Sequence, residues 1–132
     1  EVPMPKLSDA VRSGKLVGNL QAQECPSRDI LKHVTGRWAV LTLIALQGRT
    51  IRFAALRRTI GGVSDRMLTQ TLQTLEADGF VHRQAFPVVP PHVEYSLTPM
   101  GEEVAQHVRV LADWIEDNTS TILSTRKEIA AE

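Results

Sequence analysis

Hydrophobic residues recur every three or four positions between Ser64 and Gly79, which predicts an amphipathic helix there. Leu68, Leu72 and Leu75 fall on one face of this helix. Ser64 is suited to cap its first turn, and Gly79 suits the left-handed conformation that often follows a helix end. The opposite face is polar and carries Arg66, Thr69, Gln70 and Gln73. We therefore expect one face to pack on the protein and the other to contact a partner.

A shorter amphipathic helix, Phe53–Ile60, is predicted just before it, and Gly61-Gly62 supplies a turn of the length that a helix-turn-helix needs. In the second helix, the polar groups that can contact bases come early. The acidic residues Glu76 and Asp78 come only near its end. This order is expected of a helix that enters DNA with its N-terminus first. Taken alone, the helix also fits an ordinary solvent-exposed amphipathic helix.

The surrounding pattern predicts a small mixed domain. The expected elements are a helix from Pro26 to a stop at Gly36, an almost uniformly apolar helix Trp38–Leu46, an edge strand Thr50–Arg52, and strands Phe80–Phe86 and His92–Leu97. The apolar helix should form the buried centre. Because three prolines lie in the loop between the last two strands, we expect this loop to project as a wing. Before Pro26 the pattern is weak, and Leu7, Val11, Leu16, Val17 and Leu20 allow only a ragged helix.

Heptad spacing dominates the C-terminal segment, which begins with the helix-start signal Thr98-Pro99. The predicted seam consists of Val104, Val108, Leu111, Ile115 and Ile122, with Trp114 beside it and Asn118 at a polar seam position. A helix of about 24 residues would be roughly 36 Å long, more than so small a domain needs for its own core. The seam therefore predicts a partner helix, and the alternative is that it packs only on its own domain.

Length, composition and charge narrow the class of protein to which the chain can belong. The chain has 132 residues, 42% of them hydrophobic, which suits one small domain. It has neither an apolar run of the roughly 20 residues that span a bilayer nor a signal sequence, so we expect a cytoplasmic protein without membrane contact. The formal net charge is +0, but residues 26–97 carry +4 and residues 98–132 carry −4. A basic central module suits contact with phosphate groups.

Several short motifs, taken in order along the chain, resemble those of the HxlR family of winged helix-turn-helix transcriptional regulators. The likeness covers about residues 25–118 and rests on Cys25-Pro26, Gly36-Arg37-Trp38, Arg52-Phe53, Leu56-Arg57, Ser64 to Gln70, Leu72, Leu75 to Val81, Arg83, Pro91 to Thr98 and Gly101. The resemblance implies an α+β, mostly α fold with a β-hairpin wing and terminal dimerisation helices. It also implies a homodimer that places one recognition helix per protomer in successive major grooves of double-stranded DNA. The expected regions are an N-terminal arm (residues 1–24) that contributes to the dimer, the DNA-binding domain (25–98) and the dimerisation helix with its tail (99–132).

Residue chemistry divides the expected DNA contacts into two groups. Arg66 suits guanine and Gln70 suits adenine, with Thr69 and Gln73 as neighbouring contacts. The residues expected at phosphate groups are Ser64, Arg57, Arg58 and Arg83. A symmetric dimer predicts a pseudo-palindromic operator with half-sites centred about 34 to 36 Å apart, which is one helical turn, or a multiple of that distance. Repression is favoured over activation, because so small a dimer has no activation segment.

Cys25 is the single cysteine, so no disulfide within the chain can form. It lies at a predicted helix start, where the helix dipole favours a thiolate, and Arg28 is nearby. The residue is a candidate sensor of oxidants, quinones or other electrophiles, as some relatives in the family use a cysteine at this place. A symmetric dimer also allows a bridge from Cys25 to its mate or to a small thiol. The alternative is an inert, partly buried thiol.

Enzymatic chemistry finds no support in the sequence. His33, His82, His92 and His107 lie on different elements without metal-ligand spacing, so we expect no metal, no cofactor and no catalytic residues. A small aromatic effector could enter a pocket near the dimerisation helices. The competing function is a winged-helix module for protein–protein assembly, which the arginines around the recognition helix disfavour.

Overall fold

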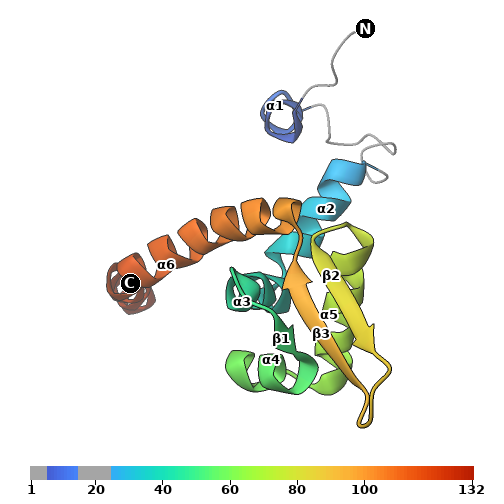
Figure 1. Ribbon diagram of the computed structural model, residues 1–132. Coiled ribbons are helices and arrows are strands. Elements are labelled where there is room, and N and C mark those ends of the chain that lie inside the picture. The colour runs from blue at the N-terminus through green and yellow to red at the C-terminus, as the bar shows by residue number, and fades with distance from the viewer. Residues whose placement is uncertain (1–5, 15–24) are drawn as a thin grey trace, which may run out of the picture.

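A computed structural model describes residues 6–14 and 25–132 of the chain (Figure 1). The elements are α1 (Leu7–Arg12), α2 (Pro26–Thr35), α3 (Arg37–Leu46), β1 (Ile51–Arg52), α4 (Phe53–Ile60), α5 (Asp65–Ala77), β2 (Val81–Phe86), β3 (His92–Leu97) and α6 (Pro99–Ala131). The fold is mostly helical with one small antiparallel sheet, as predicted. None of the helices described is long and apolar enough to cross a membrane.

Helix α3 lies at the centre of the core, as its uniformly apolar sequence predicts. Its side chains Leu43 and Leu46 are fully buried, and they are joined by Leu56 of α4. Three leucines of α5, Leu68, Leu72 and Leu75, belong to the same core cluster. The buried Thr42 is the exception, because its hydroxyl has no hydrogen-bond partner among the described residues. Burial of one leucine face of α5 leaves the opposite face of that helix directed outward.

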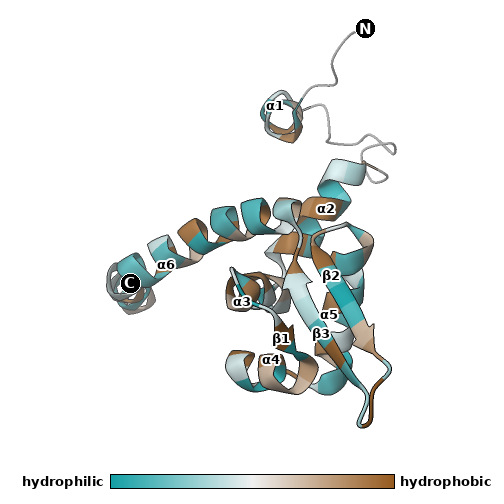
Figure 2. Cartoon of the chain, in the orientation of Figure 1, coloured by the Kyte–Doolittle hydropathy of each residue, from teal (hydrophilic) through white to brown (hydrophobic). Residues whose placement is uncertain are grey.

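The sheet has the strand order β1-β3-β2 and is antiparallel throughout. Ile51 pairs with Tyr95, so the predicted edge strand is confirmed. Strands β2 and β3 form the predicted hairpin, in which Arg83 lies opposite Tyr95. The loop at the end of this hairpin is the wing, and its Val89 is fully exposed. The tip of the wing is apolar in Figure 2, and the one arginine of the hairpin, Arg83, lies nearer its base.

A set of hydrogen bonds joins the end of α5, the start of β2 and the start of α6. The Thr98 hydroxyl accepts from the Gly101 amide at 3.0 Å and donates to the Gly79 carbonyl at 2.7 Å. Gly79 has a φ of 85°, which confirms the predicted left-handed position after α5. Gly101 packs directly against the Phe80 backbone. The origin of α6 is therefore fixed to the end of α5.

Helix α6 contains 33 residues, so the predicted length of some 24 residues was too short. At 1.5 Å per residue it is about 50 Å long. The segment beyond Ile122 contains no proline or glycine that would end a helix, which explains the extension. Only the first part packs on the domain, through Gly101, Ala105 and Val108, and the remainder extends away from it (Figure 1).

The predicted ragged N-terminal helix is described only in part. Leu7 and Val11 lie in α1, a helix of 6 residues. Leu16, Val17 and Leu20 lie outside the described residues. The expected contribution of residues 1–24 to a dimer thus stays a prediction.

Candidate DNA-reading surface

The outward face of α5 carries Arg66, Thr69, Gln70 and Gln73, which we call the reading face. All four side chains are exposed, and together with Asp65 they line an open hollow of about 560 Å³. Ser64 caps the helix as predicted, because its Oγ accepts from the Met67 amide at 3.1 Å. The Ser64 hydroxyl hydrogen stays available to donate to another acceptor. The reading face is thus polar, accessible and held by a helix whose other face is buried.

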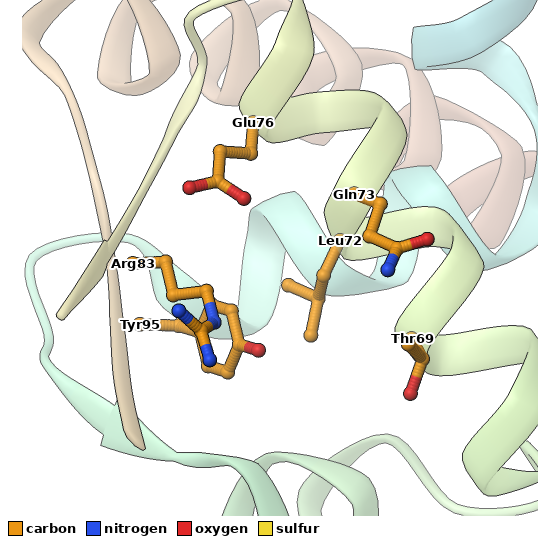
Figure 3. A pocket seen from close by; sticks show the side chains of 6 residues that line it. All are labelled: Thr69, Leu72, Gln73, Glu76, Arg83 and Tyr95. Carbon is orange, nitrogen blue, oxygen red and sulfur yellow. The ribbon is translucent and has the colours of Figure 1, made fainter. Parts of the chain in front are cut away.

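A second hollow lies between α5 and the hairpin (Figure 3). It has a volume of about 350 Å³ and is lined by Thr69, Leu72, Gln73, Glu76, Arg83 and Tyr95. Arg83 is opposite the buried Tyr95 in the sheet register, so its side chain shares the Tyr95 face and is directed toward α5. The sheet therefore brings Arg83 beside the reading face, although the two are distant in sequence.

Two further predicted contacts lie on α4. Arg57 and Arg58 are both exposed, as expected from their positions outside the apolar stripe. Arg57 Nε is 3.0 Å from Asp65 Oδ1, with side chains that are 47% and 73% exposed. So exposed an ion pair contributes little to stability, and it can open when a phosphate competes for the guanidinium. The helix-turn-helix thereby brings Arg57 to the first turn of α5.

Comparison with known proteins identifies the family to which the chain belongs. Residues 33–122 match the model of the HxlR-like helix-turn-helix family. The chain belongs to this family. The HTH-type transcriptional regulator YtfH of Escherichia coli is 63% identical over 114 residues, covering 86% of this chain and 90% of that protein.

Solved structures of similar proteins agree with this membership. The transcriptional regulator ytfH from Salmonella typhimurium has 61% identity and a TM-score of 0.77, and the match covers 83% of this chain and 98% of that one. The redox regulator HypR is similar in its oxidised form, with 38% identity, a TM-score of 0.64 and coverage of 71% and 97%. Its reduced form has 36% identity, a TM-score of 0.68 and coverage of 76% and 99%. This HxlR-like chain is accordingly a DNA-binding transcriptional regulator of helix-turn-helix type and not an enzyme.

Cys25 occupies the N-cap position of α2 in this HxlR-like chain. Its carbonyl accepts from the amides of Arg28 and Asp29, at 3.1 and 3.2 Å. The thiol makes no capping hydrogen bond and is partly exposed. The predicted position at a helix start is therefore confirmed, whereas a sensing role remains a prediction.

The predicted seam of α6 is divided between two environments. Val108 is buried in the core of its own domain, and Val104 packs against that core, so the expectation that both face a partner needs correction. Farther along, Leu111, Trp114 and Ile115 are 53%, 57% and 47% exposed, and Ile122 is partly exposed. The Asn118 side chain donates to the Trp114 carbonyl at 2.8 Å. The first seam residues lie where α6 still crosses the domain, and only the later ones remain available to another chain.

One polar contact has no counterpart in the sequence analysis. His33 Nδ1 of α2 lies 2.6 Å from Asp78 Oδ2 at the end of α5, with side chains that are 35% and 18% exposed. The two residues are 45 positions apart, and no local pattern pairs them.

In the wing, His92 stacks on Phe86 and lies 3.1 Å from Glu94. No group of metal-binding side chains occurs among residues 6–14 and 25–132.

Proposed function

We propose that this chain acts as a homodimer that binds a pseudo-palindromic operator in double-stranded DNA and represses transcription. The observation that carries the proposal is the exposed reading face of α5, which has side chains able to contact bases and lies beside Arg83 of the hairpin. An arginine can donate two hydrogen bonds to guanine, and a glutamine side chain pairs with adenine. Arg66 and Gln70 would therefore select bases, with Thr69 and Gln73 as neighbouring contacts.

Phosphate contacts would set the position of the helix in the groove. We assign this role to Ser64, Arg57, Arg58 and Arg83. Ser64 caps α5, Arg57 pairs with Asp65 in its first turn and Arg83 lines a hollow beside it, while Arg58 is an exposed residue of α4. Contacts of this kind carry no base information, but they fix register and orientation on the duplex. The exposed arginines support the assignment.

The dimer in this proposal is formed through α6. Leu111, Trp114 and Ile115 present an apolar surface on the part of α6 that extends beyond the domain. Exposed side chains of this size in a helical row favour a second helix as partner. Two recognition helices related by a two-fold axis would then meet half-sites about 34 to 36 Å apart.

The test is operator binding by an Arg66→Ala variant. Footprinting on genomic fragments first identifies the operator, and fluorescence anisotropy then compares it with a duplex changed at one guanine. We expect the variant to lose about 1–3 kcal/mol of discrimination at that base. Arg126→Ala, at the far end of α6, is the matched control and should keep the wild-type preference. A wild-type protein that binds no fragment would refute operator recognition and favour the assembly function instead.

Oxidants or electrophiles would control this binding through Cys25. The position at the start of α2 and the partly exposed thiol support the proposal, as does the similarity to a protein described as a redox regulator. Treatment with diamide or a quinone should change the operator affinity of the wild-type protein and leave that of Cys25→Ser unchanged. Complete modification of Cys25, verified by mass spectrometry, with unaltered affinity would remove the sensor role.

A further inference from the structure

Helix α5 is flanked by two different parts of the protein. On one flank, Thr69, Gln73 and Glu76 line the hollow between α5 and the hairpin together with Arg83 (Figure 3). On the other flank, α5 borders a hollow of about 350 Å³ at the junction of α2 and α3. The α5 residues that line this hollow at the α2–α3 junction are Met67, Gln70, Thr71 and Thr74. At about 100° per residue the two sets lie on roughly opposite sides of the helix, with the reading face between them.

Two cationic side chains lie at the rim of the hollow at the junction of α2 and α3. Lys32 near the end of α2 and Arg37 at the start of α3 both line it, and both are exposed. None of the ion pairs found within residues 6–14 and 25–132 involves either of them. The nearby His33 is already engaged by Asp78, 2.6 Å away. Lys32 and Arg37 thus carry two positive charges that have no acidic partner among the residues described.

The side chain of Arg37 is held in place by an aromatic residue. Its guanidinium carbon lies 4.4 Å from the centre of the Trp38 ring, and Trp38 packs against the core. A guanidinium stacked on a ring keeps its N–H groups free at the edges for two parallel bonds to a phosphate. Since Arg37 is preorganised, less side-chain entropy would be lost when an anion binds.

We propose that Lys32 and Arg37 bind the DNA backbone on the flank of α5 opposite the hairpin, while Arg83 binds the backbone on the hairpin side. This inference rests on the proposed operator binding and deepens it. A helix in the major groove, which is about 12 Å wide, lies between two phosphate strands, so cations on both flanks match both walls of the groove. Lys32 and Arg37 are therefore positioning residues that do not select bases.

The test is the salt dependence of DNA binding by the variant Lys32→Ala/Arg37→Ala. Each lost phosphate contact lowers the slope of log K against log salt by about 0.9, so four lost contacts per dimer lower it by roughly 3 to 4. Affinity for the operator and for a mismatched duplex should fall by the same factor. The control Arg126→Ala/Lys127→Ala removes the same charge from the far end of α6 and should keep the wild-type slope.

Folding is checked separately, because removal of Arg37 uncovers part of Trp38. The single variant Lys32→Ala should fold as the wild type does and lower the slope by about 2 per dimer. The variant Lys32→Arg/Arg37→Lys keeps both positive charges and should therefore have the wild-type slope. A slope unchanged in Lys32→Ala would overturn the inference, and so would a loss confined to the cognate operator. If the wild type binds DNA and only these results fail, the flank assignment is wrong, while a wild type that binds no DNA refutes the proposed function itself.

Discussion

Ser64 and Asp78 each hold one end of the recognition helix α5. The Ser64 hydroxyl satisfies an amide of the first turn, and the Asp78 carboxylate contacts His33 of α2. Between these ends the leucine face is buried and the reading face is open. Single polar contacts at its two ends thus help to hold the helix that carries the reading face.

Replacement of Ser64 by alanine should destabilise the protein by about 1 kcal/mol, because an amide in the first turn of α5 loses its acceptor. The change would be measured as a lower urea midpoint with an unchanged m-value. Ser64→Thr keeps the hydroxyl and is expected to behave nearly as the wild type does. An equal loss in both variants would mean that the cap does not contribute.

A double-mutant cycle on His33 and Asp78 should give a coupling free energy of about 1 kcal/mol at neutral pH. A hydrogen bond to a charged group is stronger than a neutral one, but the partial exposure of His33 reduces its value. The single variants His33→Ala and Asp78→Ala and the double variant would be compared by urea unfolding. Additive effects would show that the two side chains stabilise the fold independently.

At the scale of elements, the start of α6 is the joint on which the remaining geometry depends. Thr98 bonds to both the turn after α5 and the first turn of α6. Gly101 then lets α6 lie against the Phe80 backbone. Through this joint, the direction of α6 is set relative to the reading face.

Gly101→Ala should lower the free energy of unfolding by about 1–3 kcal/mol or more, because the added methyl would overlap the Phe80 carbonyl oxygen. Thermal unfolding followed by circular dichroism measures the effect. The matched control is Gly36→Ala, since a methyl there would lie 3.9 Å from its nearest neighbour, the Lys32 carbonyl oxygen, at an ordinary φ. If Gly101→Ala unfolds at the wild-type temperature, the close approach of α6 to Phe80 is wrong.

The whole molecule separates a basic module, residues 26–97, from an acidic helix. Residues 26–97 carry +4 and residues 98–132 carry −4, and most of α6 extends beyond the domain (Figure 1). The hydropathy colouring shows apolar residues recurring along this extended helix (Figure 2). This separation keeps the negative charge of α6 away from the reading face and leaves an apolar stripe for association.

Aspartate at both Leu111 and Ile115 should convert the dimer to a monomer, because two charges would be buried in the proposed helix pair. Light scattering after size-exclusion chromatography gives the molar mass. Ser120→Asp adds a charge at an exposed residue on the opposite side of α6, and we expect it to stay dimeric. A double variant that remains a dimer would place the interface elsewhere.

Operator affinity of the proposed wild-type dimer should fall by about 10³ to 10⁵ between 50 and 200 mM salt if six to ten phosphates are neutralised. The slope of log K against log salt, measured by anisotropy titrations, reports the number of contacts. A flat response would contradict a binding mode based on the arginines around α5.

The sequence by itself determined the recognition helix with both of its caps, the hairpin, the apolar α3 and the heptad pattern of α6. These features depend on periodicity and on residues a few positions apart, which a linear pattern records directly. Even there, the length of α6 was underestimated, because the heptad pattern ends before the helix does.

Only the tertiary structure decided which surfaces remain for partners. It assigned Val108 to the domain core and left Leu111 exposed, joined His33 to Asp78, and placed Lys32 and Arg37 on the flank of α5 away from Arg83. Such relations depend on how separate elements pack on one another. They connect residues tens of positions apart, so no local pattern can contain them.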